Sequence, residues 1–173
     1  MNKQETKEQV MRKISIEKVV LSIGATKEDL EKGYKLLEIL TKKKPSRTRA
    51  GPNKRIPSLG IRPNMELGVV STVRKNNSEI LKRMLEAVNN TLKKKQMSEN
   101  NFSFGIKEYI EIPNMEYYRD IGIMGLDVTV VFKRAGRRVR LKKVKRGKIP
   151  QKQKIMPEEI IKFMEENFGT KFN

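Results

Sequence analysis

The sequence contains neither cysteine nor histidine. Without cysteine the chain can form no disulfide and no thiolate metal site. Without histidine it lacks the commonest general base and the commonest transition-metal ligand. These two absences exclude most catalytic constellations, so we expect no enzymatic activity, no catalytic residue, no metal site and no cofactor.

Long apolar runs are missing as well. No stretch approaches the roughly 18 residues that are needed to span a bilayer. The start of the chain, MNKQETKEQVMRK, lacks the apolar segment of a secretory signal. We therefore expect a cytoplasmic protein without a membrane partner.

Aromatic residues are scarce. They make up 6% of the 173 residues, and apolar residues make up 36%, which is below the typical globular share. The length fits one domain. We predict a modest core in a single domain over residues 13–169, with a flexible tail at 1–12 and a short C-terminal tail at 170–173.

Acidic residues are absent from two long stretches, 42–62 and 133–154, which together hold 20 of the 39 Lys and Arg residues. The whole net charge of +19 therefore resides in this basic loop and this basic extension. Such a run must meet an anion or stay extended in water. A solvated surface or an anionic membrane would also explain it, but charge that serves only solubility is usually mixed in sign. The pattern favours phosphate binding, and the arginines favour structured RNA.

The apolar periodicity predicts an α+β fold with a curved, mostly antiparallel sheet packed against helices. We predict strands at 14–25, 65–74 and 121–132, one or two strands at 100–112 interrupted at Gly105, and a short edge strand near 54–56 within a long loop. Predicted helices are 30–41, capped by Thr26 and Asp29, a second that begins at Asn77 or Ser78 and runs through Leu92, and a third over 156–169. The first two are expected to end in lysine triplets, at 42–44 and 93–95.

Two local signals have competing interpretations. Phe102 and Phe104 alternate on one face of a strand and could stack on unpaired bases, but a chain with few aromatics needs them in its core. We therefore favour the core. Asp120 and Asp127 lie beside and within the predicted strand at 121–132. A metal-dependent nuclease needs several carboxylates that converge on one point, so we do not favour this alternative.

Several stretches, in order, resemble one family. They are KVVLSIG at 18–24, KKKPSRTRA at 42–50, LGIR at 59–62, STVR at 71–74, NFSFGIKEYI at 101–110 and IGIMGLDVTVVFKRAG at 121–136. This set is similar to the universal large-subunit ribosomal proteins that bind 5S ribosomal RNA, called L-five in bacterial and L-eleven in eukaryotic naming. The basic extension is similar to the archaeal and eukaryotic branch.

The resemblance implies a structural, non-enzymatic component of the central protuberance. Its implied partners are 5S rRNA, large-subunit rRNA, the P-site tRNA, neighbouring ribosomal proteins and a protein of the small-subunit head. Residues expected to contact rRNA are Lys42, Lys43, Lys44, Arg47, Arg49, Arg62, Thr72, Arg74, Arg137, Arg138, Arg140, Lys142 and Lys143. Residues expected to approach tRNA are Arg49, Gly51, Asn53, Lys54 and Arg55. The alternative is a nucleic-acid or polyanion-binding module outside the ribosome.

Overall fold

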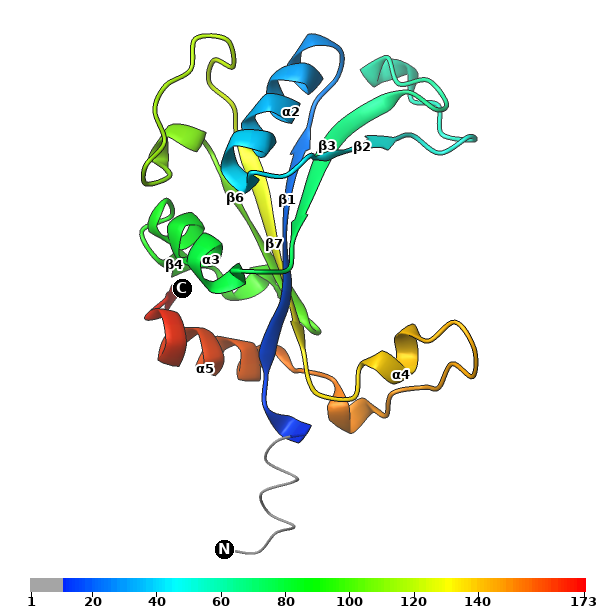
Figure 1. The fold of residues 1–173 in the computed structure, drawn as a ribbon, viewed down its shortest axis with the longest axis vertical. Coiled ribbons are helices and arrows are strands. Elements are labelled where there is room, and N and C mark those ends of the chain that lie inside the picture. Colours follow the sequence, from blue (N-terminus) through cyan, green and yellow to red (C-terminus); the bar gives the residue numbers. More distant parts are fainter. Residues whose placement is uncertain (1–10) are drawn as a thin grey trace, which may run out of the picture.

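Six strands form the central sheet of the computed structural model, which describes residues 11–173 (Figure 1). Their order is β2-β3-β1-β7-β6-β5, and every neighbouring pair is antiparallel. The strands are β1 (Ser15–Gly24), β2 (Ser46–Arg49), β3 (Glu66–Val73), β5 (Met97–Ser98), β6 (Asn101–Ile106) and β7 (Leu126–Lys133). The helices are α2 (Glu28–Thr41), α3 (Asn77–Glu86), α4 (Arg138–Leu141) and α5 (Pro157–Phe168), with short 3-10 turns between them. The α+β prediction is confirmed.

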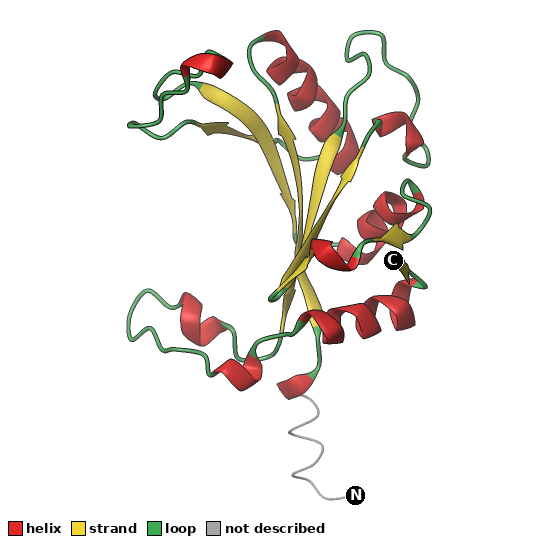
Figure 2. Cartoon of the chain, turned by 180° about the vertical axis from the view of Figure 1, so that it is seen from behind, coloured by secondary structure: helices red, strands yellow, loops and turns green. Residues whose placement is uncertain are grey.

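The core lies between one face of the sheet and the helices α2, α3 and α5, which all cover that face (Figure 2). Alternate residues of β1 and β7, such as Leu21 and Phe132, point into it and are fully buried because side chains of a strand alternate between faces. Each such burial stabilises the fold by about 1.5–3 kcal/mol. Phe102 and Phe104 are also buried there, so the core interpretation of these rings is confirmed.

Several predicted boundaries are wrong. The second helix ends at Glu86, and Leu92 belongs to a two-residue strand, β4 (Thr91–Leu92). The lysine triplet 93–95 therefore does not close a helix. β6 runs through Gly105 without interruption, and β7 begins only at Leu126. The edge strand lies at Ser46–Arg49 rather than at 54–56, because β3 offers a free edge to the residues that follow Pro45.

Neither predicted helix cap forms. The residue before α2 is Lys27 and the residue before α3 is Asn76, both with positive φ and neither with a side-chain cap hydrogen bond. Asn77 instead donates from its side-chain amide to the backbone carbonyl of Glu17 at 3.3 Å, which joins the start of α3 to β1. The third helix follows its prediction, with Pro157 in its first turn and Gly169 just beyond its end at φ 62°.

The C-terminal residues are not a free tail. β8 (Lys171–Phe172) pairs in parallel with β4, and Thr170 is buried. Phe172 packs against the core. The predicted tail at 170–173 is therefore wrong, whereas residues 1–10 of the predicted N-terminal tail lie outside the described part of the chain.

Candidate nucleic-acid interface

One face of the sheet is not covered by helices α2, α3 and α5, and we call it the open face (Figure 2). Its residues alternate with the buried core residues and lie opposite one another in the strand register. They are Ser46, Thr48, Gly68, Val70, Thr72, Lys18, Val20, Ser22, Asp127, Thr129, Val131, Asn101, Ser103 and Gly105. Most of these side chains are short and uncharged, and Lys18 and Asp127 carry the two charges of this set.

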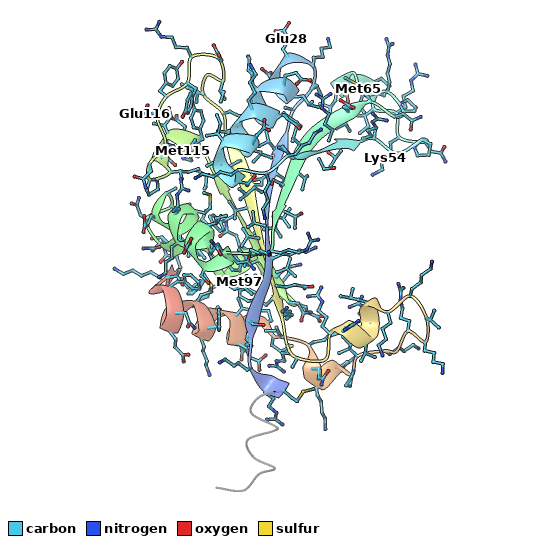
Figure 3. The ribbon with its side chains drawn as sticks, viewed as in Figure 1. Glu28, Lys54, Met65, Met97, Met115 and Glu116 are labelled. Carbon is cyan, nitrogen blue, oxygen red and sulfur yellow. The ribbon has the colours of Figure 1, made fainter. Side chains whose placement is uncertain are left out.

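The two basic segments flank the open face. The β2–β3 connection projects from one end of the sheet and α4 with its following loop projects from the other, both on the side away from α2, α3 and α5 (Figures 1 and 2). Figure 3 shows long side chains extending from both projections, with Lys54 labelled in the first. The chain thereby places cations at both ends of a surface whose centre is nearly neutral.

Carboxylates from other elements neutralise part of the basic loop. Arg47 pairs with Glu31 of α2 at 2.7 Å and with Glu66 of β3 at 3.1 Å. Its guanidinium also lies 5.5 Å from the centre of the Tyr34 ring. Arg49 pairs with Glu66 at 3.1 Å. The expectation that this charge must meet an external anion or stay extended is therefore wrong for these two arginines.

The same pairs shift the acidity of Glu66 and Arg47. Hydrogen bonds from Arg49 and Arg47, with the charge of both, hold the pKa of Glu66 below its ordinary value. The hydrogen bond to Glu66 and the charge of Glu31 raise the pKa of Arg47. Glu66 is thus ionised at neutral pH and competes with any phosphate for the two guanidiniums.

Replacing Glu66 by glutamine should release Arg49 and leave Arg47 with Glu31 as its remaining ion-pair partner. We expect E66Q to bind RNA about three- to tenfold more tightly at low salt, because the net charge rises by one and two guanidiniums lose a competing anion. The pKa of Glu66 is lower in the folded protein than its ordinary value of 4.5 in the unfolded chain, so ionised Glu66 stabilises the fold at pH values above 4.5. This stabilisation is lost as the pH falls through the lowered pKa. The urea midpoints of the two proteins should therefore converge on acidification from pH 7. Unchanged or weaker RNA binding by E66Q would contradict this competition.

Ion pairs also anchor the basic extension. Arg134, whose side chain is 9% exposed, pairs with Glu159 of α5 at 2.6 Å. Arg137 pairs with Glu17 of β1 and donates to the carbonyl of Phe132 at 2.9 Å. Lys154 pairs with Glu99 at 2.8 Å. Arg137 therefore has a structural role in addition to the RNA contact that we predict for it.

The structure separates the predicted contact residues into distinct groups. Lys42, Lys43 and Lys44 are exposed in the α2–β2 connection, and Arg62 is exposed in the β2–β3 connection with Asn53, Lys54, Arg55 and the half-buried Gly51. Thr72 lies on the open face between the two projections. Arg138, Arg140, Lys142 and Lys143 are exposed in and just after α4.

Arg74 lies apart from these groups. It lines a cavity of about 610 Å³ with Lys13 of the segment before β1, Lys82 of α3 and Phe163 and Phe168 of α5. This cavity is on the helix-covered side of the molecule rather than on the open face. The predicted set therefore does not form one continuous surface.

Two features of the interface were not predicted from the sequence. The hydroxyl side chains Ser22, Thr129 and Ser103 lie on the open face with Thr72, and their alternation with apolar residues was the signal that could have revealed them. Arg146 and Lys148 line a cavity with Asn100, which precedes β6, and with residues of β7. No local pattern could have placed them there, because the cavity is assembled from distant segments.

Two absences concern only the described residues 11–173. They contain no group of three or more aspartates and glutamates that could hold a metal ion. None of their helices combines the length and the apolar character that crossing a membrane requires.

Comparison with known proteins gives a consistent set of relatives. Residues 66–163 match the family model for the C-terminal part of the ribosomal L-five proteins. The chain is 41% identical to the large ribosomal subunit protein uL5 of Nanoarchaeum equitans, an alignment that covers 94% of this chain and 98% of that protein. It is 40% identical to uL5 of Sulfolobus acidocaldarius (98% and 97% covered) and 42% identical to uL5 of Pyrobaculum aerophilum (92% and 90% covered).

Proposed function

The chain belongs to the uL5 family of large ribosomal subunit proteins, and from this premise we propose that its open face and basic segments bind 5S rRNA and large-subunit rRNA. As a member of this family it is a structural constituent of the large subunit and not an enzyme. The observation that carries the proposal is the open face itself, which is flanked at both ends by cationic projections.

The chemistry of the open face suits an RNA helix. An A-form helix displays 2′-hydroxyl groups and base edges in a wide, shallow minor groove, and proteins read it by shape and by contacts to these groups and to phosphates. Short side chains such as Ser22, Thr72 and Thr129 would let the groove approach the sheet and would hydrogen-bond the hydroxyls. Cations beyond both ends of the sheet would meet the phosphates.

The tip of the basic loop would serve a second partner. Asn53, Lys54 and Arg55 are exposed and lie in the connection that projects beyond the sheet. We propose that this tip approaches the P-site tRNA while Lys43, Lys44 and Arg62 contact rRNA. The proposed site is the central protuberance, with other ribosomal proteins and a protein of the small-subunit head as neighbours.

Binding of 5S rRNA should depend steeply on salt. If about eight phosphates are neutralised, log affinity should fall against log salt with a slope of roughly −5 to −7. Fluorescence anisotropy with labelled 5S rRNA measures this slope. A slope shallower than about −2 would contradict binding through about eight phosphate contacts. A DNA duplex of matched length is the control. Equal affinity for both at physiological salt would favour the alternative of a general polyanion binder, as would loss of the protein from large subunits in a high-salt wash.

A further inference from the structure

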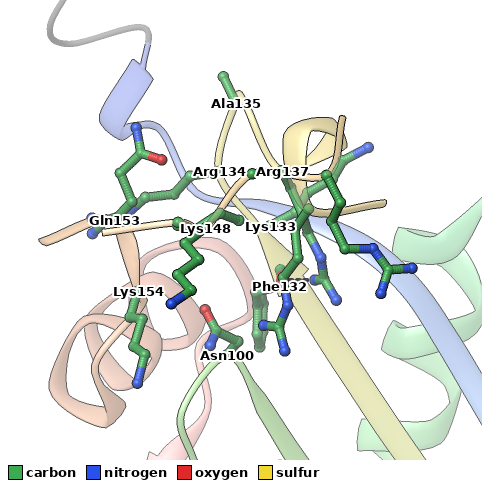
Figure 4. A pocket seen from close by; sticks show the side chains of 13 residues that line it. Asn100, Phe132, Lys133, Arg134, Ala135, Arg137, Lys148, Gln153 and Lys154 are labelled. Carbon is green, nitrogen blue, oxygen red and sulfur yellow. Dashed lines mark hydrogen bonds between the residues drawn. The ribbon is translucent and has the colours of Figure 1, made fainter. Parts of the chain in front are cut away.

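A cavity of about 440 Å³ lies where the basic extension folds back on the ends of β6 and β7 (Figure 4). Its wall includes Phe132 of β7, Asn100 just before β6, and Lys148 and Ile149 from the loop after α4. Cavities that hold small molecules commonly measure about 300–1,000 Å³. This one is therefore large enough for a ligand rather than for a single ion.

Cations surround the cavity and no carboxylate lines it. Arg134, Arg137 and Lys154 contribute to the wall while each is held by a carboxylate outside it. Lys133, Arg140, Arg146 and Lys148 also line the cavity, and within residues 11–173 no ion pair engages them. Three cations are thus fixed in place and four are available to an anion.

Neutral groups complete the wall. The side-chain oxygen of Asn100 accepts a hydrogen bond from the backbone NH of Ile155 at 3.1 Å, which orients the amide and leaves its NH₂ group for a ligand. Lys148 and Lys154 line the same cavity as this amide (Figure 4). The Nε of Arg134 is buried without a hydrogen-bond partner, which is uncommon for a buried donor. The half-buried Ile149 adds apolar surface.

We propose that this cavity binds one nucleotide of the rRNA, lifted out of its stack, with its phosphate among Arg140, Arg146 and Lys148. The proposal rests on the proposed function, because it assigns a recognition site within the same RNA interface. A phosphate alone would need only the cations, whereas an oriented amide and apolar wall suit a base and a ribose. Proteins that read RNA by sequence bind unstacked nucleotides with this combination of donors and apolar contacts.

The test measures binding of adenosine 5′-monophosphate and of inorganic phosphate to the full-length protein. Binding is followed by changes in the backbone amide NMR signals of residues 146–149. Two double variants carry the same loss of charge in the same segment: R146Q/K148Q changes the cavity, and K145Q/K152Q changes exposed residues that do not line it. We expect the first to weaken binding of the nucleotide about tenfold or more, since charge-assisted hydrogen bonds are lost. We expect the second to weaken it less than about threefold.

The outcomes separate this inference from the proposed function. Inorganic phosphate that binds as tightly as the nucleotide would overturn the nucleotide assignment, as would equal losses in the two variants. If 5S rRNA still binds tightly while the nucleotide fails to bind, only the cavity inference fails. If wild-type protein does not bind 5S rRNA, the proposed function fails whatever the nucleotide does. Thermal melts that match wild type establish that both variants are folded.

Discussion

Replacing Lys43, Lys44 and Arg62 by glutamine should weaken binding of 5S rRNA roughly 30- to 100-fold near 0.15 M salt. All three are exposed and none has an ion pair within the described chain, so no internal partner would mask their loss. Each lost phosphate contact should also reduce the steepness of the salt dependence by about one unit. Lys42 is left unchanged because it is the left-handed C-cap residue of α2, with φ 51° and a backbone NH that donates to Glu38, so its replacement would test the helix end as well as the charge.

The matched control for this triple variant is K93Q/K94Q/K95Q, which removes the same charge from exposed lysines next to the short sheet of β4 and β8. We expect the control to keep affinity within about threefold of wild type, since the general field of the protein acts over little more than a Debye length. Equal losses in the two triple variants would mean that only net charge matters.

A third variant, K54Q/R55Q at the loop tip, should keep 5S rRNA affinity but lower tRNA occupancy of the P site in reconstituted ribosomes.

Replacing Phe132 by alanine should destabilise the fold by about 3–5 kcal/mol. The ring is fully buried on β7, stacks on Phe102 with centroids 5.8 Å apart and meets the edge of Phe163 at 5.6 Å. Its removal leaves a cavity among β6, β7 and α5 that rigid neighbours cannot fill. Since a domain of this size is stable by about 5–15 kcal/mol, this single change takes a large part of the total.

Urea unfolding followed by circular dichroism measures this loss. The midpoint should fall while the slope against urea concentration stays constant. Tyr117→Ala is the control, because Tyr117 is 55% exposed in the loop before β7 and should change stability by less than about 0.5 kcal/mol. A loss below about 1 kcal/mol for Phe132→Ala would show that the core repacks around the gap.

The elements with strong local patterns could be predicted from the sequence. β1 and β3 follow their alternation of apolar residues, and α2 and α5 follow their helical spacing. The wrong predictions concern segments whose secondary structure depends on pairing with a strand distant in the sequence. Leu92 continues the helical spacing of α3 but joins β4, which exists because Lys171–Phe172 returns to pair with it. Ser46–Arg49 becomes a strand only because the edge of β3 is free.

The charge distribution likewise has a local and a tertiary part. The acid-free stretches are evident in the sequence, and the ordered motifs were enough to predict the family to which the chain belongs. The sequence could not show that Glu31 and Glu66 hold Arg47, or that Glu17 holds Arg137. Those residues lie apart along the chain, and only strand pairing together with the packing of α2 brings them together.

Composition and periodicity by themselves determined that this is a cation-rich α+β protein with a modest core, because these properties depend on residue type and near neighbours. Tertiary structure decided which cations are free to meet RNA, which face of the sheet is open, and that a cavity forms under the basic extension. These properties depend on contacts between segments distant in sequence, which pairing of strands and packing of helices create and which no local pattern encodes.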